Sequence, residues 1–357
     1  MTVMEDFLRV PKHVYEKDPF YIQEDRKKVL WQLSEQNEVF ARNQVFLECS
    51  PKRGRLAGFY HDGQMVAGKR AGFFGFFESL EDKSFCRRIF QKFELWAKNQ
   101  GAQVIFGPLD LTTYGRYRVR FAHKKIQRPF TGEPYNPYYY PQLLEDAGYK
   151  VYMDYYSLFS KSRYLALLMT KWKARKKPLP PNLTILPLSY DLWSSHTQEI
   201  SNLLHEIFKN NFAYQKISFS VFKEQISKTV LRLMDPYTSF LVRDDRCGKI
   251  VAITISLPDY AKLSYQGALD PIKEGIIQYK THRALLKKTR LLGKTFGVLE
   301  DYRKLGLYNH MMHQVAKNAK DYDTFVGCLA RGGNQSMTGI TAPHEKVRYG
   351  LYYKMLS

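Results

Sequence analysis

The spacing of apolar residues along the first half of the chain predicts alternating strands and helices. Between residues 82 and 100, apolar side chains recur every three or four positions, at Phe85, Ile89, Phe93 and Trp96, so they share one face of a helix. Gly101 is expected to end this helix. Short alternating or wholly apolar runs predict strands at 55–60, 64–67, 73–77, 104–106 and 149–159, a hairpin turn at Asp62-Gly63 and a short helix at 139–147.

The second half repeats this alternation. It predicts strands at 183–188, 239–243, 250–257, 294–300, 324–329 and 348–355, and helices at 192–208, 219–233 and 307–320. Between the halves, a basic run meets three prolines, which favour extended backbone. We therefore predict an α+β protein with two domains, 1–172 and 182–357, and a linker at 173–181. Each domain is expected to hold a mixed, mainly antiparallel sheet flanked by helices.

Charge and cysteine usage narrow the class of protein. The chain has 55 Lys and Arg against 34 Asp and Glu, a formal net charge of +21. This positive field indicates an anionic partner, and a general solubility bias explains it equally well. The four dispersed cysteines argue against a disulfide framework and against a metal site. Because there is no apolar leader and no apolar stretch of about 18 residues, we predict a cytoplasmic protein with no transmembrane segment.

The segment 296–308 has the clearest chemical pattern, because a predicted strand runs there into a turn that opens a helix. Such a turn aims backbone N–H groups and the positive end of the helix dipole at one point, which suits a pyrophosphate. The segment from Val298 to Tyr308 resembles the acyl-CoA-binding motif of the GNAT acetyltransferase superfamily, a strand, then R-x-x-G-x-G/A, then a helix. Arg303 and Gly306 hold the matching positions, and Tyr308 stands where the family usually has Gly or Ala. The resemblance implies a donor site at Leu299, Arg303, Lys304, Leu305, Gly306, Leu307 and Tyr308, and at Asn334, which resembles the start of the family's next motif.

The N-terminal half resembles the first domain of tandem-GNAT bacterial proteins. The similarity rests on its apolar strand at 73–77, on the sequence GPLDL at 107–111 and on Asn136-Pro137-Tyr138-Tyr139. This half has no R-x-x-G turn between Phe77 and Asp82, so we expect no CoA site in it.

The resemblance implies an N-acyltransferase, in which a substrate amine attacks the thioester of acetyl-CoA or another acyl-CoA. Glu300 is the expected base, and Tyr308, Ser336 and Tyr352, or the adjacent Tyr353, are candidates for the acid that protonates the leaving thiol. A structural interpretation stands beside each role: Glu300 caps the following turn, and the tyrosines pack with a tethered hydroxyl. The sequence leaves open the acceptor, the acyl chain length and the oligomeric state.

Basic segments in each half offer a surface for tRNA or for an acidic acyl carrier protein. Alternating arginines would lie on one face of a strand, where they suit phosphates. The structural alternative is an exposed strand face whose charge prevents pairing with another strand edge. The candidates are Arg116, Arg118 and Arg120, followed by Lys124 and Lys125, and the set Lys287, Lys288 and Arg290 before the proposed donor strand.

Two further functions therefore stay open. One is an aminoacyl-tRNA-dependent transferase, because the Fem-type ligases also resemble two joined GNAT domains and need a positive surface for RNA. The other is a binding module with decayed catalysis, which Tyr308 in the Gly/Ala position would fit.

Overall fold

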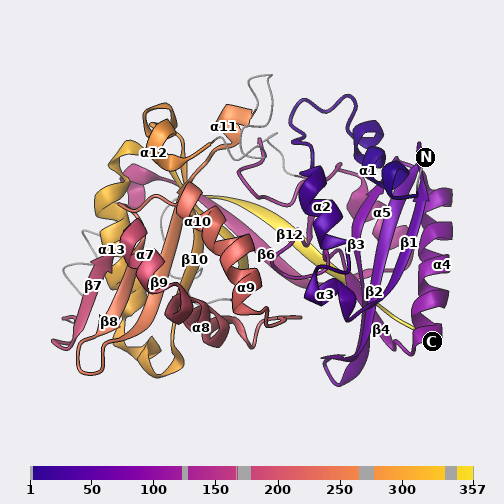
Figure 1. Ribbon diagram of the computed structural model, residues 1–357. Helices are drawn as coiled ribbons and strands as arrows, with labels where there is room; N and C mark the ends of the chain where they lie inside the picture. Colours follow the sequence, from indigo (N-terminus) through magenta and orange to yellow (C-terminus); the bar gives the residue numbers. More distant parts are fainter. Residues whose placement is uncertain are drawn as a thin grey trace. The chain divides into compact units, whose positions relative to one another are not determined.

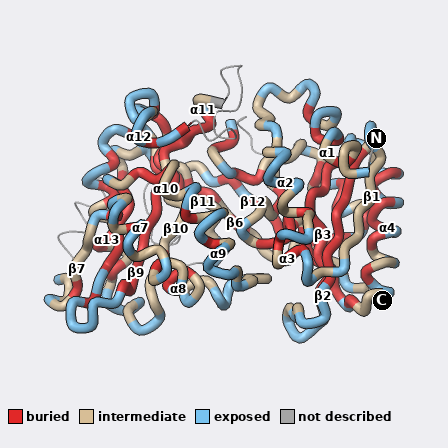
Figure 2. The backbone as a smooth tube through the Cα atoms, viewed as in Figure 1, coloured by how far each residue is buried: buried red, intermediate tan, exposed pale blue. Residues whose placement is uncertain are grey.

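The computed structural model describes residues 3–122, 128–165, 167, 178–264, 277–333 and 344–356 (Figure 1). The chain divides into two compact units. The N-terminal unit comprises Met1–Tyr155, Phe212–Gln215 and Val347–Ser357, and the C-terminal unit comprises Tyr156–Asn211 and Lys216–Lys346. In each unit the buried residues follow the strands (Figure 2).

The N-terminal unit is built on an antiparallel meander that continues into a parallel pair. Strands β1 (Gln44–Ser50), β2 (Gly54–Val66) and β3 (Lys69–Ser79) are antiparallel, β4 (Val104–Gly107) is parallel to β3, and β12 (His344–Met355) is antiparallel to β4. The short β5 (Val119–Arg120) also pairs with β12. The helices are α1 (Val3–Val14), α2 (Arg26–Gln32), α3 (Glu38–Ala41), α4 (Lys83–Gln100) and α5 (Tyr140–Asp146).

Helix α4 confirms the predicted periodicity and both of its ends. Asp82 is the N-cap, and its side chain accepts a hydrogen bond from the N–H of Phe85. Gly101 is the C-cap with φ 99°, a conformation that glycine adopts without steric cost. The buried face of α4 packs against the apolar residues of β3 and closes the core of the unit.

The predicted hairpin turn at Asp62-Gly63 is wrong. These residues lie inside β2, at a register shift between Tyr60 and Met65, and the chain turns at Ala67-Gly68. Both turn residues have positive φ, 49° and 75°, which matches the twist of a two-residue hairpin.

The C-terminal unit has a second meander. Strands β7 (Leu183–Pro187), β8 (Phe240–Asp244), β9 (Lys249–Pro258) and β10 (Arg290–Val298) are antiparallel, and β11 (Thr324–Arg331) is parallel to β10. The helices are α7 (Tyr190–Ser195), α8 (Thr197–Phe208), α9 (Phe219–Val221) with its π-helical continuation to Ser227, α10 (Lys228–Leu233), α11 (Ala261–Ser264), α12 (Tyr279–His282) and α13 (Leu307–Asn318).

Helices cover both faces of this second sheet. Along β8, Leu241 packs in a cluster with Trp193 of α7 and Leu203 of α8. Its neighbours Phe240 and Val242 pack in clusters with Met312 and Met311 of α13. Because successive side chains of a strand point to opposite faces, α7 and α8 lie on one face and α13 on the other. The α+β prediction, with a mixed and mainly antiparallel sheet flanked by helices in each half, is confirmed.

The compact units differ from the predicted domain ranges at the C-terminus. From Val347 onward, β12 belongs to the N-terminal unit, because it pairs with β4 of that unit. Strand β6 (Lys150–Lys161) likewise begins in one unit and ends in the other. The ranges 1–172 and 182–357, and the linker at 173–181, stay a prediction.

In the described part of the chain, no helix is long and apolar enough to cross a membrane. In the same ranges, no cluster of His, Cys, Asp and Glu side chains could hold a metal ion.

Candidate donor site at the β10–α13 turn

The parallel strands β10 and β11 pair only at their beginnings. Their register runs from Arg290 opposite Thr324 to Gly293 opposite Gly327. A register shift then occurs on β10 between Gly293 and Thr295, and β10 continues beside β9 to Val298. The two parallel strands therefore stop pairing with each other after the two glycines, while both continue for several residues.

The turn after β10 is a 3-10 helix, Glu300–Leu305, that leads directly into α13. The N–H of Leu299 donates to the carbonyl of Val251 at 2.9 Å, which fixes the start of the turn to β9. Tyr302 fixes the middle of the turn, because its hydroxyl donates to Oδ2 of Asp244 at 2.9 Å.

Asp244 is the anchor of this turn, and sequence analysis missed it. It is buried and accepts hydrogen bonds from Asn182, Arg246 and Tyr302. The hydrogen bond from Arg246 is the largest cause of a pKa well below the usual range for this carboxyl. In the sequence, the only indication of this anchoring role is a charged residue at the end of an apolar strand.

Gly306 is the N-cap of α13 and has φ 71°. No described side chain caps this helix, and the carbonyl of Gly306 accepts from the N–H groups of Asn309 and His310 at 3.0 and 3.3 Å. Among the described residues, a Cβ added at Gly306, or at Gly327 on β11, would meet no heavy atom within 4 Å. The positive end of α13 therefore has no described capping side chain, a setting that favours an anionic group.

Exposed charged residues surround the turn. Glu300 and Arg303 are exposed, as are Asp301 and Lys304, and Leu305 is exposed beside them. Nε of Arg303 donates to the carbonyl of Val298 at 3.4 Å, so its side chain lies back along the end of β10. The backbone N–H groups and these two basic side chains could hold a diphosphate, as the sequence predicts.

Tyr308 packs into the sheet. Its ring lies 4.3 Å from the ring of Phe296, centroid to centroid, next to the cluster that contains Met312. Burial raises the pKa of Tyr308 to about 12. The phenol is therefore protonated at neutral pH.

Two of the other predicted catalytic residues belong to the N-terminal unit, and their catalytic role stays a prediction. Tyr352 and Tyr353 lie on β12 in the N-terminal unit, where Tyr352 is fully buried and its hydroxyl contacts Oε1 of Glu145 at 3.4 Å. Burial is the main cause that raises the pKa of Tyr352. A packing role explains this placement. Ser336, Asn334, Lys124 and Lys125 lie outside the described residues.

The expectation that three arginines share one face of a strand is wrong. Only Val119 and Arg120 are in strand conformation, and Arg118 has φ 83°. Arg116 and Arg120 are ion-paired within the N-terminal unit, Arg120 with Glu133 at 3.2 Å. In the second basic set, Lys287 and Lys288 are exposed, and Nε of Arg290 donates to Asp259 at 2.6 Å.

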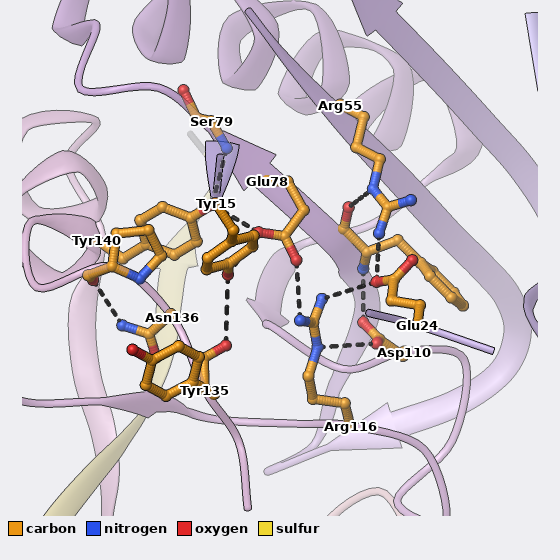
Figure 3. A network of polar contacts seen from close by, with 12 residues as sticks. Tyr15, Glu24, Arg55, Glu78, Ser79, Asp110, Arg116, Tyr135, Asn136 and Tyr140 are labelled. Atoms are coloured by element: carbon orange, nitrogen blue, oxygen red, sulfur yellow. Dashed lines mark hydrogen bonds and ion pairs between the residues drawn. The ribbon is translucent and has the colours of Figure 1, made fainter. Parts of the chain in front are cut away.

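Arg116 belongs to a buried polar network that the sequence did not reveal (Figure 3). Its guanidinium contacts Glu78 at 2.8 Å and Asp110 at 3.2 Å. Oε2 of Glu78 also accepts from the hydroxyls of Tyr15 and Tyr140, at 2.9 and 2.7 Å. Burial acts to lower the pKa of Arg116, but the surrounding carboxylates outweigh it and raise that pKa.

Comparisons with known proteins give structural matches alone. No family model and no curated protein matches the sequence. A tandem GNAT protein from the clavulanic acid biosynthesis pathway has a TM-score of 0.51 and 9% identity, over 99% of this chain and 95% of that chain. A probable N-acyltransferase from Enterococcus faecalis has a TM-score of 0.50 and 10% identity, over 99% of this chain and 70% of that chain.

A third match is the GCN5-related glucosamine N-acetyltransferase region of a fungal multi-domain β-N-acetylglucosaminidase. Its TM-score is 0.51 at 11% identity, and the match covers 98% of this chain and 37% of that chain. Matches at these identities establish the fold and not the substrate. The chain has the fold of a tandem GNAT protein.

Proposed function

We propose that the protein is an N-acyltransferase that transfers an acyl group from acyl-CoA to an amine. The observation that carries the proposal is the β10–α13 turn. It combines a helix N-terminus that no described side chain caps, at Gly306, with a parallel strand pair that stops pairing at Gly293 and Gly327. The shared fold supports the reaction class by analogy.

Residues of the turn would bind the donor through its phosphates. The N–H groups in the first turn of a helix point out of its N-terminus, so the start of α13 at Leu307 suits a diphosphate. Arg303 and Lys304 are exposed beside them and add positive charge. Gly327 would leave room next to the strands for the thioester arm, because a Cβ added there meets no heavy atom of the described residues within 4 Å.

Two proton transfers accompany the chemistry. A C–N bond forms to the amine and the C–S bond of the thioester breaks, so the amine must lose a proton and the sulfur must gain one. Glu300, exposed directly after β10, is the proposed base. Tyr308 is the proposed acid, because its phenol stays protonated at neutral pH. Ser336 stays a prediction for the same role.

The donor site is tested by two variants of one residue. Gly306→Asp and Gly306→Asn differ only in charge, and both residue types tolerate positive φ. We expect calorimetric titration with acetyl-CoA to show at least about tenfold weaker binding for the Asp variant than for the Asn variant, because the carboxylate repels the phosphates. Equal affinities for the two variants would contradict the proposal.

The proposed base is tested separately. Glu300→Gln keeps the size of the side chain, so donor affinity should stay near the wild-type value while kcat falls by about 10²–10⁴-fold. Asp301→Asn is the matched control, because it removes the neighbouring exposed carboxylate. An unchanged kcat in the Glu300 variant would leave Glu300 as a residue of the turn only.

An aminoacyl-tRNA-dependent transferase is the second candidate, and the net charge of +21 favours it. Ion pairs hold Arg116 and Arg120 inside the N-terminal unit, so the surface for RNA falls on exposed lysines such as Lys287 and Lys288. This candidate predicts binding of total tRNA that weakens steeply with salt and with reversal of these two lysine charges. Absence of binding at low salt would remove it. Acetyl-CoA binding without transfer to any amine would instead favour the decayed binding module.

A further inference from the structure

Arg118 differs from the two arginines beside it, because no carboxylate of the described residues pairs with it. Arg116 lies 2.8 Å from Glu78, and Arg120 lies 3.2 Å from Glu133. No ion pair among the described residues includes Arg118, although the residue is only 6% exposed. A buried cation without a counter-charge is costly, so its retention calls for a physical reason.

Two aromatic rings cover the faces of the Arg118 guanidinium. Its Cζ lies 3.6 Å from the centroid of the Tyr117 ring and 3.8 Å from that of the Tyr155 ring. Nη2 donates to the hydroxyl of Tyr117. Cation–π contact offsets part of the burial cost and fixes the plane of the group. A side-chain hydrogen bond with Tyr155 also acts on the group. Nε alone stays buried without a hydrogen-bond partner, so one N–H on the edge of the guanidinium is left unsatisfied.

The backbone at Arg118 is strained as well. Its φ of 83° is a conformation that residues with a side chain rarely adopt, and its N–H donates to the carbonyl of Pro108 at 3.0 Å. Strain of this kind persists where surrounding structure imposes it, and it is typical of functional sites. The fold therefore holds this one arginine in a fixed orientation at some cost.

We propose that Arg118 is an oxyanion-binding residue of the N-terminal unit, which takes a carboxylate or phosphate group of a small ligand on the edge of its guanidinium. A planar guanidinium binds such groups through parallel N–H donors, and the bound anion would supply the missing counter-charge. Burial lowers the pKa of Arg118 to about 10, so the group is charged at neutral pH. The site goes beyond the proposed donor site, because it uses no residue of the β10–α13 turn.

The site is tested on the full chain by thermal unfolding with inorganic phosphate and with acetate as separate probes. Concentrations of about 5 mM avoid the general stabilisation that phosphate produces when it is concentrated. For the wild type we expect a rise in Tm on the order of 2–5 °C with at least one probe. A response to phosphate alone indicates a phosphate ester as ligand, and a response to acetate alone indicates a carboxylate.

Two variants separate binding from a loss of charge. Arg118→Met should lose the response to the probes, whereas Arg42→Met removes an exposed arginine of the same unit and should keep it. An equal rise in Tm for the wild type and Arg118→Met, or no rise in either, overturns the proposal.

A second measurement, made on the wild-type protein, tests the proposal even if Arg118→Met fails to fold. In wild-type protein with ¹⁵N-labelled arginine, the Nε–H signal of Arg118 is assigned by its disappearance in Arg118→Lys. We expect this signal to shift on addition of the active probe, and an unmoved signal contradicts the proposal. Because inorganic phosphate can also bind at the proposed donor site, only the part of the response that is lost in Arg118→Met is assigned to Arg118. Failure of the donor site itself would be seen in the titration with acetyl-CoA, which uses neither probe.

Discussion

Asp82 in the N-terminal unit and Gly306 in the C-terminal unit occupy corresponding positions in the fold. Each is the N-cap of the helix that leads from one strand of a parallel pair to the other, α4 between β3 and β4, and α13 between β10 and β11. The carboxylate of Asp82 accepts from the N–H of Phe85 at 2.9 Å and pairs with Arg53. Gly306 has no side chain to do the same. The chain's own anion therefore occupies one helix terminus, whereas no described side chain caps the other, and a Cβ added at Gly306 would meet no heavy atom of the described residues within 4 Å.

The parallel strand pairs β3/β4 and β10/β11 also differ, because the chain itself fills the position beyond the first pair. In the N-terminal unit, β3 and β4 pair from Ala71 opposite Val104 to Phe73 opposite Phe106. Beyond that point the chain itself supplies partners to β3. The N–H of Leu109 donates to the carbonyl of Phe74 at 2.7 Å, and Oδ1 of Asp110 accepts from the N–H of Phe76 at 2.6 Å. A Cβ at Gly75 would lie 2.2 Å from the carbonyl oxygen of Leu109, so no room remains there.

These differences predict one donor site per chain. Native mass spectrometry of the wild-type protein with excess acetyl-CoA should show a single bound molecule, and calorimetric titration should give a stoichiometry near one. The reason is that protein atoms fill the corresponding positions in the N-terminal unit. Binding of two molecules per chain would contradict the prediction of one site. If Gly306→Asp then removed one of the two, the proposal of a donor site at Gly306 would still hold.

Stability should depend on Asp82 in a pH-dependent way. Hydrogen bonds from Arg53 are the largest cause that lowers the pKa of Asp82 in the folded state. A lowered pKa stabilises the fold at pH values above that of the unfolded carboxyl, about 3.9, and the contribution is lost as the pH falls further. We expect Asp82→Ala to lower the free energy of unfolding by about 1–2 kcal/mol at neutral pH, and by less below about pH 4.

Urea unfolding at several pH values measures this dependence. Glu81→Ala is the control, since it removes an exposed carboxylate one residue earlier that caps no helix. If the Asp82 variant has the stability of the wild type at neutral pH, its cap and its ion pair contribute nothing.

Local signals explain what sequence analysis predicted well. Asp82 and Gly101 bound α4 because a short polar acceptor and a residue that tolerates positive φ are each preferred at those ends. The β10–α13 turn was also predictable, because a strand, a glycine and a helix follow one another within a few residues. The turn at Ala67 has no comparable signal, since alanine rarely adopts a positive φ and its residue type does not indicate the φ of 49° found there.

Contacts between distant segments could not be predicted. The alternation of Arg116, Arg118 and Arg120 fits a strand, but their surroundings are set by residues far away in the sequence. Glu78 lies on β3 and Tyr155 on β6, and neither forms a motif with the arginines. The same holds for β12, whose pairing with β4 joins the end of the chain to the N-terminal unit. The charge pattern therefore predicted exposed arginine side chains, whereas the fold buries or half-buries them.

The buried network around Glu78 predicts a large effect of a small change. Glu78 is fully buried and contacts Arg116, Tyr15 and Tyr140 (Figure 3). Glu78→Gln removes the charge and leaves Arg116 with a weaker set of partners. We expect a loss of about 3–5 kcal/mol in the free energy of unfolding, measured by urea denaturation. Glu81→Gln, on the exposed turn after β3, should change it by less than about 0.5 kcal/mol.

A double variant distinguishes this ion pair from general packing. Because a lone buried charge costs more than an apolar pair, Glu78→Leu combined with Arg116→Leu should be less destabilised than the sum of the two single variants. Additive effects would mean that the two charges do not interact.

Tyr308→Phe separates catalysis from packing at the donor site. The variant keeps the ring that packs against Phe296 and removes only the hydroxyl. If Tyr308 protonates the leaving thiol, kcat falls by about 10²–10⁴-fold, while donor affinity and Tm stay near the wild-type values. Since burial raises the pKa of this phenol to about 12, the wild type should show no alkaline loss of kcat from Tyr308 below that pH. A pH profile of both proteins in saturating acetyl-CoA measures these effects, and an unchanged kcat in the variant would assign Tyr308 to packing alone.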